Sequence, residues 1–253
     1  MLHPCLLHLT LVVAALPGSL KTADGIPIDS MTNWQLDNDA GWRAYYRGDL
    51  TRAEERFKSA IELVSPYQKA DPRLLARSYC DLAQVFLGQS RYDQAEPLAK
   101  WALKVREKYP RIPIETIYQN LYVLAQIHCA QRRFPEAEPL LRRALVLQEK
   151  SLGREHAALA TTLDDLAWVV AETGKLAEAE LLYKRALAIC TKKLQPDDLD
   201  IAIISEHYAL LLRRLNRLTE AEWLEARAKT IRSDAAAAAN RVVPVERTRG
   251  STP

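Results

Sequence analysis

The chain has 253 residues and a net charge of +3, and 48% of its residues are hydrophobic against 26% charged. Acidic and basic side chains are mixed along the sequence, which excludes the basic stripe that is typical of nucleic-acid-binding proteins. Only eight glycines and three phenylalanines occur, whereas Ala, Leu, Glu and Arg are abundant, so the composition favours helix over sheet.

The first expected element is an apolar leader. The run Leu6–Leu16 is too short for a helix of about 20 residues that crosses a bilayer, and no other segment is predicted to span a membrane. Its length, the small residues Val13-Ala14-Ala15 and the helix-breaking Pro17-Gly18 indicate a secretory signal. Residues 1–33 are therefore predicted to be a signal peptide plus linker; a disordered leader or a misplaced start codon is the alternative. The protein is expected to be secreted or periplasmic if the leader is a signal peptide, and cytoplasmic otherwise.

Residues 34–235 are predicted to form one domain of five repeats, because the sequence repeats with a period of 42 residues. Each repeat contains an Ala-Glu pair and, seven residues after its alanine, a second alanine. The pairs begin at Ala53, Ala95, Ala137, Ala179 and Ala221, and the second alanines are Ala60, Ala102, Ala144, Ala186 and Ala228. A fixed period of this size indicates a solenoid of stacked helical units.

Each repeat is predicted to contain two helices. In the fourth repeat, residues 158–172 place Leu159, Leu163 and Leu166 on one face at helical spacing. Thr173-Gly174-Lys175 breaks this helix, and a second one follows over residues 176–194. The alanines of the second helix are expected where neighbouring backbones approach closely, so a leucine there should overpack and cost about 1–3 kcal/mol.

This arrangement resembles the tetratricopeptide repeat. The pattern of large residue, Leu, small residue and aromatic appears as Tyr79, Leu82, Ala83 and Phe86. The 42-residue unit, with "AEPLLRRAL", "SLGREH" and "LATTLDDLA", is similar to the kinesin light chain type. HEAT and armadillo repeats have similar periods, but armadillo units carry three helices and these show two. The resemblance implies an all-α, right-handed superhelical solenoid of about five helix-turn-helix repeats.

The ends of the repeat array are expected to be polar caps. Asp37 occupies the position that Tyr79, Leu121 and Leu163 hold in later repeats, and Glu225 replaces Tyr183 in the fifth repeat. Terminal repeats of a solenoid need such polar outer faces. Residues 236–253 are predicted to be a disordered tail.

No motif in the chain supports catalysis, and no metal or cofactor is expected. The four cysteines match neither a zinc pattern nor a Cys-x-x-Cys motif. His128 and Cys129 are adjacent, so on a helix they point about 100° apart and cannot form a nucleophile–base pair. Asp164-Asp165 is interpreted as groove-lining or solvated rather than as a metal or acid–base pair. The chain is therefore predicted to be non-enzymatic.

The resemblance also implies where a partner binds, because the first helix of each repeat lines a concave face that holds extended peptides. The residues that it places on that face are Asn38, Asp39, Trp42, Tyr45, Arg77, Asp81, Gln84, Gln119, Tyr122, Gln126, Asp164, Asp165, Trp168, Glu206 and His207. Kinesin-light-chain-type repeats often carry asparagine before the Leu-Ala pair; Asp81, Val123, Asp165 and His207 replace it here, and an aspartate accepts hydrogen bonds but does not donate them.

The predicted function is a protein-interaction scaffold that binds another protein or an extended peptide through this face. Acids alternate with aromatic rings along the first helices, so the segment is expected to carry Lys or Arg next to aromatic or apolar residues. A structural module that assembles through its ends or its outer face, with the groove unused, is the alternative. No nucleic-acid partner is expected.

Overall fold

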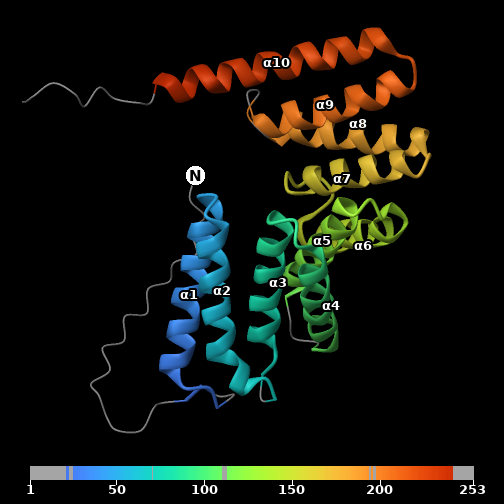
Figure 1. Cartoon of the computed structure of the whole chain (residues 1–253). Helices are drawn as coiled ribbons and strands as arrows, with labels where there is room; N and C mark the ends of the chain where they lie inside the picture. Colours follow the sequence, from blue (N-terminus) through green and yellow to red (C-terminus); the bar gives the residue numbers. More distant parts are fainter. Residues whose placement is uncertain are drawn as a thin grey trace, which may run out of the picture. The chain divides into compact units, whose positions relative to one another are not determined.

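The computed structural model describes residues 21–22, 25–69, 71–109, 113–193, 195 and 198–241, with side chains to residue 237. The predicted signal peptide and most of the predicted tail lie outside these residues. The chain divides into two compact units, Met1–Leu75 and Ala76–Pro253, which are described separately. All regular elements of the described part are helical (Figure 1), as the composition predicts.

The first unit is a helical hairpin. Helix α1 spans Ile28–Tyr46, helix α2 spans Leu50–Val64, and a single 3-10 turn, η1, follows at Ser65–Tyr67. Helix α1 thus begins inside the segment that was expected to be leader and linker. The two helices approach closely at Gly41, where an added Cβ atom would lie 2.7 Å from the ring of Phe57. The small first-helix residue of the repeat pattern therefore serves close packing here.

The second unit contains the remaining helices, and the boundary between the units falls within α3. The helices are α3 Arg73–Gly88, α4 Tyr92–Lys108, α5 Ile114–Ala130, α6 Phe134–Leu152, α7 Leu159–Glu172, α8 Leu176–Lys193, α9 Leu199–Arg214 and α10 Leu218–Arg241. In chain order α4 contacts α5, α5 contacts α6, and so on to α10. Nearest-neighbour packing of this kind is that of a helical repeat solenoid. Helix α10 continues six residues past the predicted end of the domain.

The turn between the two helices of every repeat has the same backbone conformation. One residue adopts a positive φ, and these residues recur with the 42-residue period: Gly48, Ser90, Arg132, Gly174 and Asn216. In the third repeat the amide of Arg133 donates to the carbonyl of His128, and the amide of Lys175 bonds Val170 in the fourth. This pattern closes the first helix of each repeat with a left-handed residue, as in a Schellman motif.

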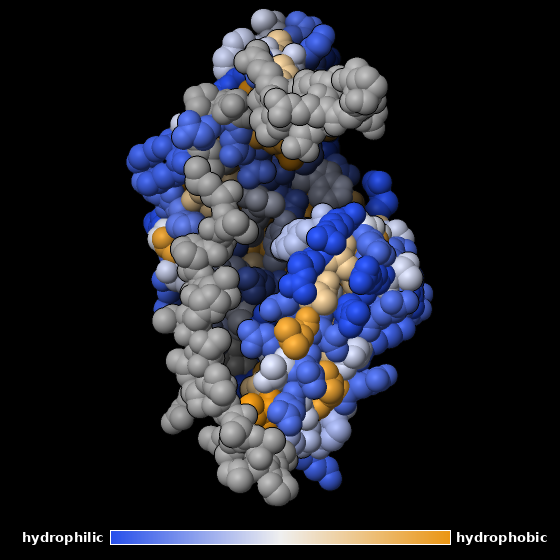
Figure 2. Space-filling view, turned by 90° about the vertical axis from the view of Figure 1, so that its left-hand side faces the viewer, coloured by the Kyte–Doolittle hydropathy of each residue, from blue (hydrophilic) through white to orange (hydrophobic). Residues whose placement is uncertain are grey.

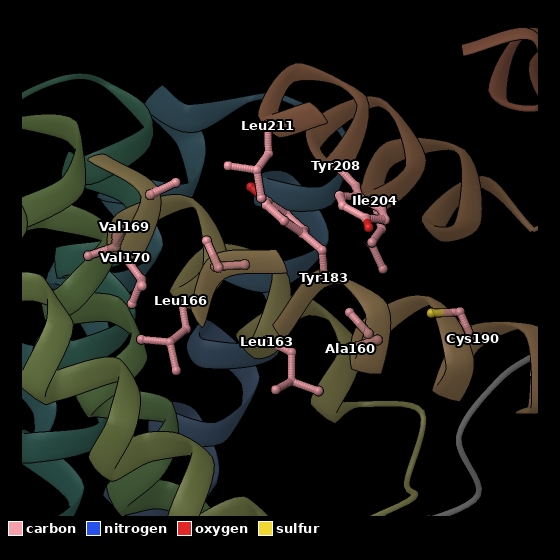
Figure 3. Packing of buried hydrophobic residues seen from close by; sticks show 14 of the residues in the cluster. Ala160, Leu163, Leu166, Val169, Val170, Tyr183, Cys190, Ile204, Tyr208 and Leu211 are labelled. Carbon is pink, nitrogen blue, oxygen red and sulfur yellow. The ribbon is translucent and has the colours of Figure 1, made fainter. Parts of the chain in front are cut away.

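The core of the second unit confirms the predicted packing. The alanines of both alanine columns, including Ala137, Ala144, Ala179 and Ala186, are fully buried. The predicted inner face of α7, with Leu159, Leu163, Leu166, Ala167 and Val170, is buried as well. Tyr183 of α8 extends toward α9, where it stacks on Tyr208 with ring centroids 5.7 Å apart (Figure 3). Small residues thus let the helix backbones approach, and large side chains fill the space beside them.

Figure 2 shows the hydropathy of one face of the described residues. The face shown in Figure 2 is mostly hydrophilic, with small and separate hydrophobic patches. None of the described helices is long and apolar enough to cross a membrane.

Candidate partner-binding site

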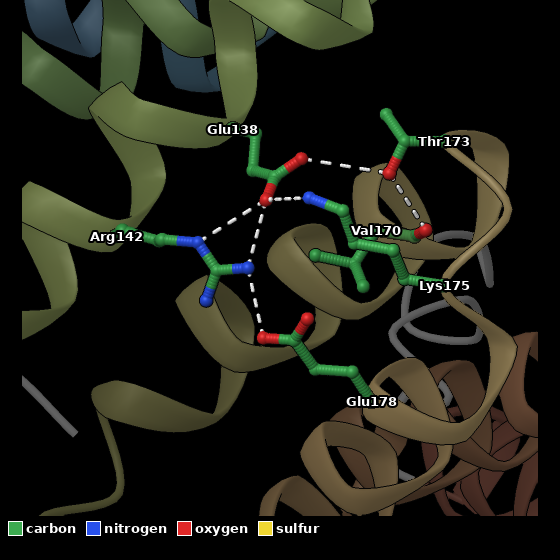
Figure 4. Close-up of polar contacts among 6 residues, drawn as sticks. All are labelled: Glu138, Arg142, Val170, Thr173, Lys175 and Glu178. Carbon is green, nitrogen blue, oxygen red and sulfur yellow. Dashed lines mark hydrogen bonds and ion pairs between the residues drawn. The ribbon is translucent and has the colours of Figure 1, made fainter.

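A ladder of ion pairs joins the second helices of successive repeats. Glu138 of α6 accepts hydrogen bonds from Arg142 at 2.8 Å and from Lys175 at 2.6 Å, at the start of α8 (Figure 4). Arg142 also reaches Glu178 at 2.8 Å. The hydrogen bond from Lys175 is the largest cause that lowers the pKa of Glu138, followed in that direction by the bond from Arg142.

The same contact recurs on both sides of this one. Glu96 accepts from Arg133 at 2.9 Å, and Glu180 accepts from Arg217 at 2.6 Å. In each pair the cation lies 37 residues after the glutamate of the Ala-Glu pair. We call these three pairs the ladder. Because the contact is the same in each repeat, the ladder fixes how one repeat stacks on the next.

A second set of polar contacts joins the first helices of successive repeats. The hydroxyl of Tyr122 on α5 donates to Asp165 on α7 at 2.5 Å. One repeat later, Nδ1 of His207 on α9 lies 2.8 Å from Oδ2 of Asp164. Both pairs are 43 residues apart, so they occupy equivalent positions. Unlike the ladder, these contacts change their chemistry from repeat to repeat.

These contacts place titratable groups in a partly buried setting. Burial raises the pKa of Asp165 to about 6, and the charge of Asp164 adds to this effect, whereas the bond from Tyr122 opposes it. The hydrogen bond to Asp164 raises the pKa of His207, against the effect of its burial. The second carboxylate oxygen of Asp164 is buried and has no hydrogen-bond partner among the described residues. A protonated His207 is therefore favoured beside the two acids.

Asp165 and Trp168 line two hollows on the surface of the second unit. The larger one, of about 720 Å³, lies on α7, α8 and α9 and is named the Trp168 hollow. Its lining comprises Asp165, Trp168, Ala171, Glu172, Tyr183, His207, Leu210, Leu211, Arg213 and Arg214. The smaller one, of about 320 Å³, is lined by Leu87, Gln126, Cys129, Ala130, Leu141, Asp165 and Trp168. The two hollows share one acid and one indole.

The indole ring of Trp168 packs against a buried aromatic ring. Its ring meets Phe134 of α6 edge-on at 5.0 Å between centroids, and it remains 39% exposed. Leu210 of α9 is 60% exposed beside the same hollow. The hollow thus presents a rigid aromatic ring and a free aliphatic side chain.

Burial shifts the pKa values of two cysteines and of His128 in the second unit. Burial raises the pKa of Cys129 to about 12 and that of Cys190 to about 11, so neither thiol forms a thiolate readily. Burial lowers the pKa of His128. Among the described residues, no group of three or more His, Cys, Asp or Glu side chains is placed to hold a metal ion.

Comparison with known proteins identifies the repeats. A family model described as tetratricopeptide repeat matches residues 43–108 and 117–192, and a second model with the same description matches residues 80–151. The matched residues make up more than half of the chain.

The chain belongs to the tetratricopeptide repeat family. Proteins with this repeat are in general protein-interaction scaffolds, and the fold is typically non-catalytic.

Several solved structures share the fold of this chain. The structure of BtubC (BKLC) from P. vanneervenii has a TM-score of 0.66 at 22% identity and covers 89% of this chain and 95% of its own. A putative kinesin light chain from P. anserina with nearly identical TPR-like repeats has a TM-score of 0.64 at 19% identity, covering 82% and 96%. A Rap protein complexed with competence and sporulation factor has a TM-score of 0.63 at 17% identity, covering 81% and 56%. At these identities the likeness shows the fold, which this chain shares with structures of kinesin-light-chain-like repeats. No curated protein matches.

The structure brings several predicted site residues of this tetratricopeptide domain together. Asp165, Trp168 and His207 line the Trp168 hollow, and Gln126 lines the smaller hollow. Tyr122 and Asp164 contact Asp165 and His207, respectively.

Other predicted site residues lie away from the hollows or are buried. Glu206 is held by Arg232 at 2.7 Å, and Arg77 lies 4.0 Å from Asp81, which is buried. Gln84 is half-buried and Gln119 is exposed. In the first unit Asp39 is exposed, and Trp42 packs on Tyr45 and Phe57. Asn38 is only 1% exposed, which differs from the expected place on an open face; its position lies on the packed side of α1, together with Trp34 and Gly41.

Sequence reasoning missed the charged rim of the Trp168 hollow. Glu172 pairs with Arg214 at 2.7 Å, and Arg213 pairs with Glu225 at 2.7 Å. Glu172 and Arg214 are 42 residues apart, so they hold equivalent positions in adjacent tetratricopeptide repeats. Opposite charges at one repeat position were the signal that could have predicted this pair.

Proposed function

We propose that this protein is a non-catalytic scaffold that binds a partner protein segment at the Trp168 hollow. The observation that supports this proposal best is the half-exposed indole of Trp168, fixed by Phe134 and facing a hollow of about 720 Å³. A rigid ring that needs no reordering is a strong anchor for binding, because little side-chain entropy is lost. Leu210 adds apolar area beside it.

The charges around the hollow support a segment with a basic residue next to an apolar one. Glu172 and Arg213 already have partners of opposite charge. Among the described residues Asp165 accepts a hydrogen bond from the neutral hydroxyl of Tyr122, and His207 pairs with Asp164, so Asp165 has no direct ion pair of its own. With a pKa of about 6, Asp165 is mostly ionised at neutral pH and attracts a Lys or Arg of the segment. An apolar or aromatic side chain of the same segment would fill the hollow.

A fold neighbour gives further support. The Rap protein of similar fold was solved with competence and sporulation factor bound, so a tetratricopeptide solenoid of this kind holds a separate ligand. For the present chain this supports the use of a helix-lined surface as the binding site.

A peptide array probed with the full chain tests this function. The best binder is then measured by fluorescence polarisation against Trp168→Ala and Asp165→Asn. Trp168→Ala should weaken binding by about tenfold or more, as hot-spot residues do. The matched control is Trp223→Ala, because Trp223 is 62% exposed on α10 and does not line the hollow.

The outcomes separate the alternatives. Binders rich in Asp and Glu, or equal effects of the two tryptophan changes, would contradict the proposal. Concentration-dependent oligomers with no bound peptide would favour the structural assembly module instead.

A further inference from the structure

A second hollow lies on the first unit and is lined by arginines. It measures about 350 Å³, and Arg43, Arg47, Arg52 and Arg56 line it from α1, the turn and α2. Only Arg56 has an acidic partner, since it bonds Asp37 at 3.0 Å. Among the described residues no carboxylate lies within ion-pair distance of the guanidinium groups of the other three. We call this site the arginine hollow.

The positions of Leu36 and Arg43 in α1 can be compared with the equivalent positions in the first helices of later repeats. The positions equivalent to Leu36 and Arg43 are Asn120 and Ile127 in α5, and Thr162 and Val169 in α7; all four are buried. The side-chain amide of Asn120 donates to the carbonyl of Ala99 at 3.0 Å, on the preceding helix α4. In the second unit, this face of each first helix therefore receives the second helix of the repeat before it.

In α1 the same face has a different composition. Leu36 is 59% exposed, and arginine replaces the buried aliphatic residue at position 43. A polar residue without charge would be sufficient to cap a solenoid. Three unpaired arginines around a hollow, beside an exposed leucine, instead match an occupant with carboxylates next to an apolar stripe.

We propose that the arginine hollow binds an acidic amphipathic helix of another protein. Its carboxylates would accept bonds from Arg43, Arg47 and Arg52, and one of its apolar residues would cover Leu36. The segment of this chain before Ile28 has Asp24 as its single acid, so it does not supply these carboxylates. A nucleic-acid backbone fits less well, because a row of phosphates offers no apolar group to cover the exposed Leu36.

The test uses three labelled peptides and the full chain. The probe is a fluorescein-labelled 18-residue helix with a leucine stripe flanked by glutamates. The two controls are the same peptide with lysine for glutamate and the same composition with a central proline, which breaks the helix. Binding is measured by fluorescence polarisation at fixed ionic strength.

Arg43→Glu combined with Arg47→Glu should weaken binding of the acidic helix by about tenfold or more, because charge-assisted bonds become like-charge contacts. The matched control is Lys104→Glu combined with Lys150→Glu, which changes the net charge equally through exposed residues of the second unit and should alter binding less than about twofold. Circular dichroism verifies that both variants are folded, and Arg43→Gln with Arg47→Gln gives a milder version of the same test.

Equal weakening by the two double variants would overturn the proposal, as would equal binding of the proline peptide. Sedimentation that shows dimers lost on charge reversal, without peptide binding, would also overturn it, because the occupant would then be a second copy of this chain.

Discussion

Two sets of contacts connect the repeats of the second unit with the same register but with different chemistry. The ladder pairs a glutamate with a cation at every step, from Glu96 with Arg133 to Glu180 with Arg217. The contacts between first helices pair a tyrosine with an aspartate at one step and an aspartate with a histidine at the next. The constant contact serves stacking, which is the same everywhere. The variable contact lies beside the Trp168 hollow, where each repeat can present a different surface to a partner.

The strongest test of this difference is the removal of whole repeats. Deletion of residues 113–154 should lower the free energy of unfolding by about 1–3 kcal/mol more than deletion of residues 197–238. The first deletion leaves Asp165 without Tyr122 inside the array, whereas the second removes His207 but also exposes Asp164 to water. In the shortened chain Glu96 would face Lys175 and restore the ladder, whereas Asp165 would face Cys80 instead of Tyr122. Urea denaturation of the two deletions measures the effect, and equal losses would contradict the solenoid contacts described above.

Single substitutions in the two sets of contacts should change the free energy of unfolding in different directions. Glu138→Gln weakens bonds to Arg142 and Lys175 and should cost about 1–2 kcal/mol at pH 8. Asp165→Asn removes a charge that burial disfavours and keeps an acceptor for Tyr122, so it should leave stability unchanged or raise it by about 1 kcal/mol. Chemical denaturation of both variants at pH 8 decides this. A loss from Asp165→Asn as large as that from Glu138→Gln would remove the distinction.

The contributions of the two sets to stability should be lost in opposite directions of pH change. The pKa of Glu180 is lowered to about 2, so its contribution is complete above the ordinary value and is lost as the pH falls toward 2. The pKa values of Asp165 and His207 are raised, to about 6 for Asp165, so their contribution is present at low pH and is lost as the pH rises through 6 and above.

Melting temperature measured from pH 2 to pH 9 provides the readout. Asp165→Asn combined with His207→Asn should flatten the decline that sets in as the pH rises above about 4, and leave the loss of stability below that pH unchanged. Glu180→Gln should flatten the acid side instead. His207 faces Asp164 and Asp165 on α7 and Glu206 on its own helix, and all three acids are unchanged in the Glu180→Gln variant.

The smallest effect is expected where both partners are exposed. Lys192 and Glu155 form an ion pair at 2.8 Å, but their side chains are 62% and 65% exposed. Lys192→Ala should change the free energy of unfolding by less than about 0.5 kcal/mol, as exposed pairs do. A larger change in urea denaturation would mean that distance alone, rather than burial, determines the strength of the ladder.

The sequence predicted the repeat architecture because its cause is local and periodic. The alanine columns, the turn at Gly174 and the buried face of α7 follow from spacing alone, and the structure confirms them. The contacts of Asp164 and Asp165 could not be predicted, because they depend on side chains 43 residues away whose rotamers the spacing does not determine. Likewise, the burial of Asn38 depends on how α1 packs, which repeat columns alone did not reveal. Leader cleavage stays a prediction.

The left-handed residue in each turn has a consequence for how such a chain can change length. Gly48, Ser90, Arg132, Gly174 and Asn216 hold one conformation at one spacing, although only two of them are glycine. The chain therefore enters and leaves each of these turns in the same direction. A 42-residue segment that runs from one turn to the next can replace any other such segment at its two ends. A segment of 42 residues copied in frame would meet matching junctions on both sides. Tandem duplication of coding sequence can thus lengthen this protein by whole repeats without requiring a new turn conformation.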